Sequence, residues 1–126
     1  MPITDWDDAY ANAAYIPGAE TFLSDWPERS QRLREAHAPE RLIYGSGARQ
    51  TIDLYRPKTA SQGLTVIVHG GYWMRFSPAE FGFLAAGPLA HGQSVAVVSY
   101  TLAPDARIAA ITAEVARAVT MAAAAV

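Results

Sequence analysis

The residues from Leu64 to Trp73 have the types and the order of a site for acyl-transfer chemistry. Leu64 to Val68 is a short apolar run rich in β-branched residues, which predicts a buried parallel strand. His69, Gly70 and Gly71 follow, and two residues without a Cβ allow a sharp turn and the close approach of a ligand to the main chain. Ligands of open α/β sheets bind at the carboxyl ends of the strands. The pattern therefore predicts an oxyanion loop, in which fixed N–H groups stabilise a negatively charged oxygen.

Two serines next to glycines are the other candidates for acyl-transfer chemistry. Ser94 fits a loosened G-x-S-x-A pattern, but a nucleophile elbow needs a strand before the serine and a helix after it. The strand pattern here comes after Ser94. Ser46 lies between two glycines in what the sequence indicates is a hairpin turn. We predict that neither serine is a nucleophile.

Metal and cofactor chemistry is not indicated by the sequence. His37, His69 and His91 share no i, i+4 spacing and have no clustered carboxylates beside them. Cysteine is absent, which excludes disulfides, thiolate metal sites and a cysteine nucleophile. The G-x-G-x-x-G pattern of dinucleotide-binding turns is also absent. We expect no metal and no cofactor.

Three stretches resemble the kynurenine formamidase (arylformamidase) and esterase-like branch of the α/β-hydrolases. His69 to Trp73, HGGYW, matches the HGGxW form of that family's oxyanion motif, a cousin of the HGGG loop of lipases and esterases. Tyr10 to Gly18 resembles the family's amino-terminal segment, and Ser99 to Arg107 resembles the strand-to-helix loop that follows its HGG motif. The stretches occur in family order. The resemblance implies an α/β fold, the amino-terminal portion of an α/β-hydrolase.

The resemblance also implies roles within residues 69–76, which we call the HGG loop. The N–H groups of Gly71 and Tyr72 are the expected oxyanion donors, and Gly70 is expected to shape the turn. One possible role for His69 is that of a general base. In this motif, however, the histidine braces the loop through hydrogen bonds, and we expect that supporting role.

Three further residues are candidate substrate contacts on the same grounds. Trp73 is expected to line the acyl or aryl pocket, with a plain core tryptophan as the alternative. Tyr10 and Asn12 belong to the segment that folds over the mouth of the active site in the family. The alternative for Tyr10 is aromatic packing with Trp6 and Tyr15 on the surface.

The resemblance implies that the catalytic triad lies beyond Val126. In α/β-hydrolases it follows the oxyanion loop in the order Ser, Asp or Glu, His, and Val126 falls in what resembles the helix before the nucleophile strand. We therefore expect a serine hydrolase of small amides or esters, with an N-formyl aryl amide as the implied substrate and a triad beyond Val126. The alternative is a non-catalytic binding or assembly fragment that needs a complementing chain.

Composition and charge restrict the remaining classes of protein. The 126 residues are 51% hydrophobic with a net charge of −2, which argues against disorder. The sequence has no basic run, which argues against a nucleic-acid-binding surface. The opening MPITDWDD lacks the apolar core of a signal peptide. Glu114 and Arg117 interrupt the alanine-rich stretch near Val126, which favours a helix covering the core over a membrane span. We expect a cytoplasmic protein that contacts neither nucleic acid nor membranes.

The predicted helices begin with a short one from about Asp5. A longer helix is predicted from Ser24, a favourable N-cap, to about His37. Ser77 is predicted to cap another helix, and Asp105 the last one. The apolar face of that last helix is predicted to consist of Ile108, Ile111, Val115, Ala118, Val119 and Ala122, with Glu114 and Arg117 elsewhere.

The predicted strands besides 64–68 are 41–44, 50–55 and 94–100. The first two form an antiparallel hairpin, and alternation of Ile52 and Leu54 with more polar residues predicts that the second is exposed on one face. The strand, helix and strand after residue 63 predict a parallel crossover.

Residues 1–126 are predicted to be a single, incomplete α/β-hydrolase domain, within which residues 1–38 form a helical cap segment. By the family's topology one edge of the strand 64–68 should be unpaired and apolar, which favours association. The expected partners are the small ester or amide substrate and either a second copy of the chain or a complementing carboxyl-terminal half.

Overall fold

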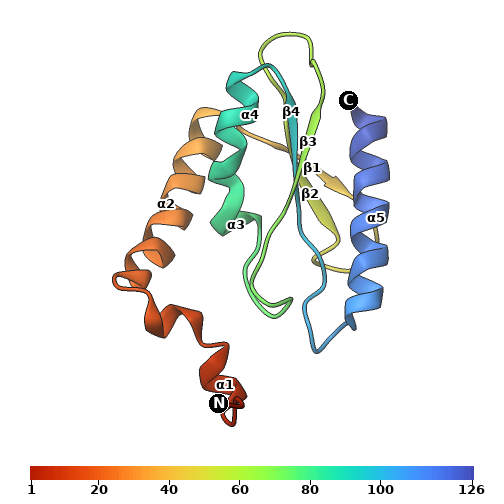
Figure 1. Cartoon of the computed structure of the whole chain (residues 1–126). Helices are drawn as coiled ribbons and strands as arrows, with labels where there is room; N and C mark the ends of the chain where they lie inside the picture. The colour runs from red at the N-terminus through yellow and green to blue at the C-terminus, as the bar shows by residue number, and fades with distance from the viewer.

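The computed structural model describes residues 1–126 and shows one mixed sheet between two helical layers (Figure 1). The helices are α1 (Trp6–Ala9), η1 (Asn12–Tyr15), α2 (Ala19–Ala36), α3 (Pro78–Phe81), η2 (Gly82–Ala85), α4 (Ala86–Ala90) and α5 (Ile108–Ala125). The strands are β1 (Glu40–Ile43), β2 (Thr51–Tyr55), β3 (Leu64–Val68) and β4 (Ser94–Val98). Helices α2, α3 and α4 lie on one side of the sheet and α5 on the other. The predicted α/β class is confirmed.

The order of the strands places the last one in the interior of the sheet. The order is β1-β2-β4-β3, with β1 and β2 forming the predicted antiparallel hairpin. Strand β4 pairs antiparallel with β2, where Ile52 faces Val98, and parallel with β3, where Leu64 faces Ser94. The predicted parallel crossover from β3 to β4 is therefore confirmed.

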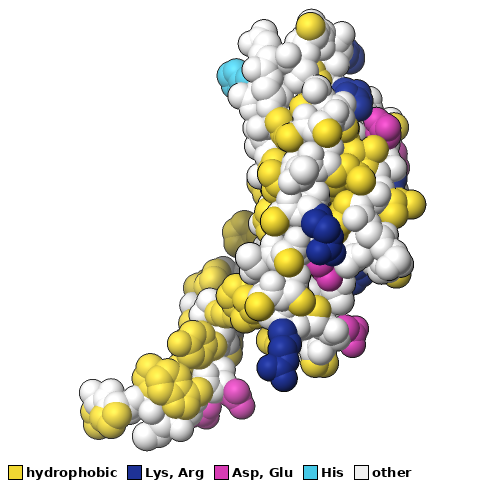
Figure 2. All heavy atoms as spheres, turned by 90° about the vertical axis from the view of Figure 1, so that its right-hand side faces the viewer, with side chains coloured by type: hydrophobic (Ala, Val, Ile, Leu, Met, Phe, Trp, Pro, Cys, Tyr) yellow, Lys and Arg dark blue, Asp and Glu magenta, His cyan; other side chains and the backbone are white.

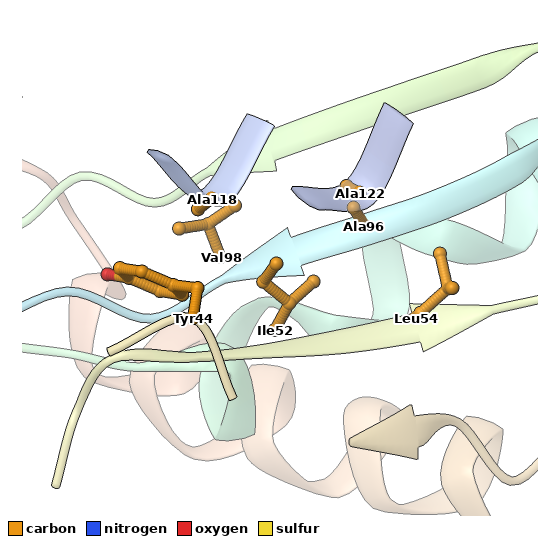
Figure 3. Close-up of a cluster of buried hydrophobic side chains, with 7 residues drawn as sticks. All are labelled: Tyr44, Ile52, Leu54, Ala96, Val98, Ala118 and Ala122. Carbon is orange, nitrogen blue, oxygen red and sulfur yellow. The ribbon is translucent and has the colours of Figure 1, made fainter. Parts of the chain in front are cut away.

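Apolar side chains fill both faces of the two interior strands. Every residue of β4 is buried, as expected for a strand covered by helices on both sides. The cluster on the α5 side consists of Tyr44, Ile52, Leu54, Ala96, Val98, Ala118 and Ala122 (Figure 3). The cluster on the opposite side consists of Tyr55, Ala85, Val95 and Val97.

The predicted half-exposure of β2 is wrong. Asp53 is only 3% exposed and Tyr55 is fully buried, so the face that was expected to meet solvent is covered. The reason is that β2 lies between β1 and β4, beneath the layer that contains α2. Arg41 of β1 neutralises the buried Asp53 carboxylate through an ion pair of 2.8 Å.

The predicted burial of β3 is also wrong, because β3 is an edge strand. It pairs only with β4, and Val68 at its end is 48% exposed. The unpaired apolar edge expected from the family's topology is therefore present. The cause is the insertion of β4 between β2 and β3, which leaves the outer edge of β3 without a neighbour.

Helix α2 starts earlier than the sequence indicated. It begins at Ala19, after Gly18 in a left-handed conformation with φ +75°, and includes Ser24 and Pro27 in its interior. The Ser24 hydroxyl donates to the main-chain oxygen of Thr21 at 2.9 Å instead of capping a helix. Proline removes only one intrahelical hydrogen bond, and a helix of 18 residues that packs on its neighbours tolerates that loss.

Of the side-chain caps predicted at Ser24, Ser77 and Asp105, the structure confirms the one at Ser77. Asp5 caps α1 by accepting from the N–H of Asp8 at 3.0 Å. Ser77 and Glu80 form the predicted capping box of α3. Asp105, however, does not cap α5, which begins without a side-chain cap.

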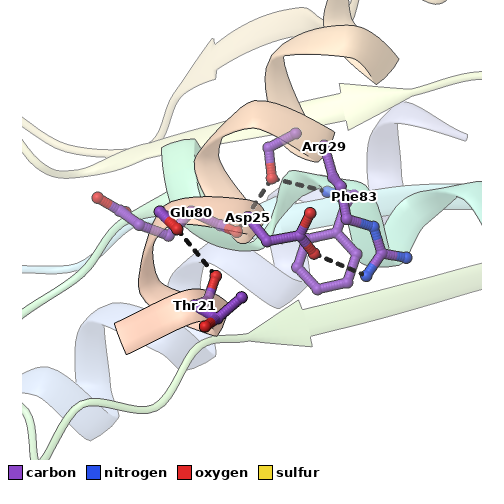
Figure 4. Close-up of polar contacts among 7 residues, drawn as sticks. Thr21, Asp25, Arg29, Glu80 and Phe83 are labelled. Carbon is purple, nitrogen blue, oxygen red and sulfur yellow. Dashed lines mark hydrogen bonds and ion pairs between the residues drawn. The ribbon is translucent and has the colours of Figure 1, made fainter. Parts of the chain in front are cut away.

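Two polar contacts and one ring contact join α2 to the helices beside it (Figure 4). Ser30 is fully buried, and its hydroxyl donates to the main-chain oxygen of Glu80 at 3.0 Å while accepting from the N–H of Phe83 at 3.0 Å. The Arg29 guanidinium lies 4.3 Å from the centre of the Phe83 ring and 3.7 Å from the Asp25 carboxylate. These contacts fix the layer that covers Tyr55.

Helix α5 differs from the sequence analysis in one respect. Its buried residues are Ile111, Glu114, Ala118 and Ala122, so Glu114 lies on the inner face. The Glu114 carboxylate accepts from the N–H of Thr101 at 2.9 Å. Burial alone would raise the pKa of Glu114, but hydrogen bonds from Thr101 and Gln50 outweigh it and lower the pKa. By length and composition α5 could also cross a membrane; here its inner face covers the sheet.

The amino-terminal segment projects from the body of the molecule with apolar side chains exposed (Figure 2). Trp6 and Tyr10 stack with ring centres 6.1 Å apart, and the Tyr15 hydroxyl donates to the Asp8 carboxylate at 2.5 Å. Tyr10 thus packs on Trp6 at the surface, as the alternative interpretation proposed. Tyr15 does not join this packing and is held by its hydrogen bond to Asp8.

Replacing Ile52 with alanine tests the core on the α5 side. Ile52 is fully buried, so Ile52→Ala is expected to lower the free energy of unfolding by about 3 kcal/mol through lost contacts and a residual cavity. Urea denaturation followed by circular dichroism measures this change. Ile43→Ala is the matched control, because Ile43 is 68% exposed and its loss should cost less than about 0.5 kcal/mol. Equal losses for the two variants would contradict the described core.

Candidate functional site

The HGG loop leaves the carboxyl end of β3 in an unusual backbone conformation. Gly71, Tyr72 and Trp73 have φ values of +114°, +52° and +59°. Such values are uncommon outside glycine. The N–H of Met74 donates to the main-chain oxygen of Gly71 at 3.0 Å and closes the turn. The N–H groups of Gly71 and Tyr72 donate to no main-chain oxygen of the chain.

The two glycines have roles that differ from those expected. A Cβ on Gly71 would lie 2.6 Å from the main-chain oxygen of Arg75 and 2.7 Å from the Phe76 ring, so Gly71 shapes the turn. A Cβ on Gly70 would have no atom within 4 Å. The expectation that Gly70 shapes the turn is therefore corrected. Gly70 instead leaves open space beside the loop, where a ligand can approach the main chain.

His69 is held inside the protein. It is 5% exposed, and its ring lies between the rings of Tyr100 at 4.4 Å and Phe81 at 6.0 Å. Its Nδ1 lies 2.8 Å from the main-chain oxygen of Gly70, so the neutral ring donates from Nδ1 and leaves Nε2 as a buried acceptor without a partner. Burial lowers the pKa of His69 and so favours this neutral form. In this structure His69 contacts the loop and no hydroxyl nucleophile.

Two residues that the sequence analysis did not single out anchor the loop at both ends. The hydroxyl of Tyr100 donates to the main-chain oxygen of His69 at 2.7 Å. Arg49 donates from Nε to the main-chain oxygen of Tyr100 at 2.8 Å and from its Nη2 to that of Phe76. Tyr100 lies in the family-like stretch 99–107, which was a signal for it. Arg49 lies in a hairpin turn, and nothing in the local sequence indicates its role.

An aromatic cluster supports the loop from the side of α2. Phe81 lies 5.2 Å from Trp26 and 5.4 Å from Phe76, measured between ring centres. Trp26 and Phe76 meet edge to face at 6.4 Å. With His69 stacked on Phe81, aromatic contacts run without a break from α2 to the start of the HGG loop.

The structure brings the amino-terminal segment to the HGG loop. The side-chain amide of Asn12 donates to the Tyr72 hydroxyl at 2.9 Å, and that hydroxyl donates to the main-chain oxygen of Tyr10 at 3.3 Å. The rings of Tyr10 and Tyr72 meet edge to face at 6.4 Å. Trp73 is 45% exposed, which removes the alternative of a core tryptophan. Tyr10, Asn12, Tyr72 and Trp73 thus lie at or beside one loop.

The two serines considered in the sequence analysis are not hydrogen-bonded to a histidine. Ser94 is fully buried at the start of β4 and donates to the hydroxyl of Ser61 at 2.8 Å. Ser46 is exposed in the turn between β1 and β2. Across residues 1–126, no serine or threonine is hydrogen-bonded to an imidazole, and no group of histidines and carboxylates could hold a metal ion. The loop thus presents two main-chain N–H groups without a partner in the chain, with the exposed rings of Tyr72 and Trp73 beside them.

Comparisons with known proteins find relatives but no matching family model. The chain is 32% identical to kynurenine formamidase from Salmo salar over 119 residues, which are 92% of this chain and 40% of the relative. It is 37% identical over 91 residues to kynurenine formamidase from Drosophila melanogaster, which covers 68% of this chain and 30% of that protein. The chain thus spans less than half the length of these curated relatives.

Solved structures agree with the sequence comparison. A candidate thioesterase from Silicibacter sp. TM1040 superposes with a TM-score of 0.91 at 42% identity, over 94% of this chain and 47% of that one. Esterase B from Lactobacillus rhamnosis HN001 superposes with a TM-score of 0.52 at 20% identity, over 79% of this chain and 36% of that one. The second likeness concerns the fold alone.

Alanine substitutions of the two glycines are expected to differ in their cost to stability. Gly71→Ala forces a Cβ against the Arg75 oxygen at a φ of +114°, so we expect it to lower the free energy of unfolding by ~2 kcal/mol or more. Gly70→Ala is the matched control and should change it by less than ~0.5 kcal/mol, because no atom lies within 4 Å of the new Cβ. Urea denaturation gives both values. A larger loss for Gly70→Ala would show that the turn is built differently.

Burial of His69 predicts a pH dependence of stability. The unfolded chain protonates this ring near pH 6.5, and the folded-state pKa is lower. Between the two pKa values the unfolded state binds more protons, so stability declines as the pH falls below about 6.5, by at most about 1.4 kcal/mol per pH unit. Urea denaturation at several pH values measures the decline. His69→Asn should reduce the slope, while His91→Asn, at an exposed site, should leave it. An unchanged slope in His69→Asn would refute the assignment.

Proposed function

Because the chain is a homologue of kynurenine formamidase and has the fold of the amino-terminal portion of an α/β-hydrolase, we propose that it supplies the oxyanion loop of a serine hydrolase acting on small amides or esters. The observation that carries the proposal is the pair of N–H groups on Gly71 and Tyr72. They have no acceptor within the chain, and they lie at the carboxyl end of a parallel strand, where α/β sheets bind ligands.

The proposed chemistry is stabilisation of the charge that develops during acyl transfer. Attack on a carbonyl places negative charge on its oxygen, and each fixed donor aimed at that oxygen lowers the barrier by about 3 kcal/mol. Gly71 and Tyr72 would supply two main-chain donors that need no rearrangement, because their positive φ values are set by the fold. A third donor would come from the residue after the nucleophile. Gly70, with no Cβ, leaves room for the acyl group.

The proposed substrate class is an N-formyl aryl amide. Support comes from the relatives named kynurenine formamidase and from the aromatic surface beside the loop. Trp73 and Tyr72 are 45% and 47% exposed, and Tyr10 is 58% exposed. Exposed rings at the edge of a site suit an aryl leaving group, which can stack on them. Tyr10 and Asn12 are the proposed contacts at the mouth of the site.

The nucleophile is proposed to lie outside residues 1–126. No described serine is paired with an imidazole, and the family-like order of motifs places the triad after Val126. The unpaired edge of β3 supports the same proposal, since an additional strand can extend the sheet there. We place the nucleophile strand of a carboxyl-terminal half at this edge.

Hydrolysis assays on two lengths of the protein test the proposal. A form that continues past Val126 is expected to hydrolyse p-nitrophenyl acetate and an N-formyl aryl amide, and a serine-directed phosphonate should abolish both activities. Residues 1–126 alone are expected to show no turnover of either compound above buffer. Failure of the longer form on both compounds, or phosphonate-resistant turnover by residues 1–126, would overturn the proposal.

A further inference from the structure

A polar cavity of about 420 Å³ lies apart from the HGG loop. It is open to solvent on one side and is lined by the last turn of α2, the hairpin of β1 and β2, the start of α3 and the end of β4. The residues that give it its chemistry are Arg34, Arg41, Arg49, Thr51, Asp53 and Ser99. Sites for small molecules typically enclose about 300 to 1,000 Å³, so the cavity has a suitable size.

The charges around the cavity do not cancel. Arg41 and Asp53 neutralise each other, because both Nε and Nη2 of Arg41 lie within 2.9 Å of one Asp53 oxygen. Arg49 donates only to neutral main-chain oxygens. Arg34 forms no ion pair. The walls therefore carry two uncompensated positive charges in a chain whose net charge is −2.

Glu35, Glu40 and Glu80 are adjacent in sequence to lining residues but do not supply the missing charge, because each is bound elsewhere, to Gln31, Arg56 and Ser77 respectively. Glu80 follows the lining residue Ala79, but its carboxylate accepts from the N–H and the hydroxyl of Ser77, both at 2.8 Å. It is not part of the lining. Arg34 and Arg49 are both partly buried, and a partly buried charge without a counter-charge costs free energy. An anion between these guanidinium groups would remove that cost.

We propose that this cavity binds a small molecule through an anionic group, either a phosphate or a carboxylate. Guanidinium groups present paired N–H donors that match the oxygens of both groups. Thr51 and Ser99 add two hydroxyl-bearing side chains to the lining. The site is separate from the proposed oxyanion loop, because no residue from 69 to 76 lines the cavity. Arg49 connects the two through its bond to Phe76.

Titration with simple anions tests the proposal on residues 1–126. Inorganic phosphate and acetate are added separately at constant ionic strength, with chloride as the reference anion, and backbone amide shifts are followed by NMR. Saturable shifts at Thr51, Ala79 and Ser99 are expected with phosphate or acetate, and the stronger of the two identifies the preferred group. Because the wild-type chain is used, this measurement does not depend on how any variant folds, and it is independent of hydrolytic activity.

Two variants on one helix separate a built site from general electrostatic attraction. Arg34→Gln should weaken binding of the preferred anion about tenfold, the loss expected for one charge-assisted hydrogen bond. Arg32→Gln removes the same charge from an exposed position, where Arg32 pairs with Glu28, and should leave the affinity within about twofold. Absence of saturable shifts with both anions would overturn the proposal. Equal weakening by the two variants would overturn it as well.

Discussion

The hydrogen bond from the Tyr100 hydroxyl to the main-chain oxygen of His69 is the contact on which the HGG loop depends. Tyr100 is 2% exposed and follows the wholly buried β4, so its position is fixed by the core. The bond ties the carboxyl end of β3 to that of β4, and Arg49 ties the far end of the loop to the main chain of Tyr100. Residues with positive φ persist only where their surroundings determine them. Here both ends of the turn are determined by the same strand.

The burial of β4 and the geometry of the HGG loop therefore depend on the same packing elements. Strand β4 needs apolar layers on both faces, which α5 supplies on one side and the layer of α2, α3 and α4 on the other. The second layer also carries Phe81 and Trp26, whose rings reach His69 and Phe76. A substitution that weakens the contact between α2 and η2, for instance at Ser30, would therefore alter the position of the proposed oxyanion donors. The effect would pass through side-chain packing alone.

The sequence predicted what local residue types determine. The strand before the two glycines, the hairpin of β1 and β2, the parallel crossover and the capping box at Ser77 depend on neighbouring residues, and each is present. The wrong predictions share a different cause. The full burial of β2, the partial exposure of β3 and the inward side of Glu114 depend on which elements pack together, and residues far apart in the chain decide that.

The steric need for glycine at position 71, and not at position 70, has the same origin, since only the later course of the loop past Arg75 creates the clash at Gly71. Family resemblance could direct attention to this pair but could not assign the two roles. The cavity with Arg34 and Arg49 was beyond sequence reasoning for a related reason. Its walls come from five separated stretches, none of which has a sequence pattern that indicates anion binding.

The order of strands has a consequence for synthesis on the ribosome. Strands β2 and β3 leave the ribosome before β4, yet neither pairs with the other, because β4 takes the place between them. About 43 residues follow the end of β2, and about 30 follow the end of β3, before β4 is complete. Until then each of the two strands keeps an edge that β4 will fill. Pairing between strands that are far apart in the sequence is slow, and the apolar edges of the strands stay exposed until it is complete. The nascent chain is therefore most vulnerable to misassociation just before Val98 emerges, at the stage when its amino-terminal helices are already made.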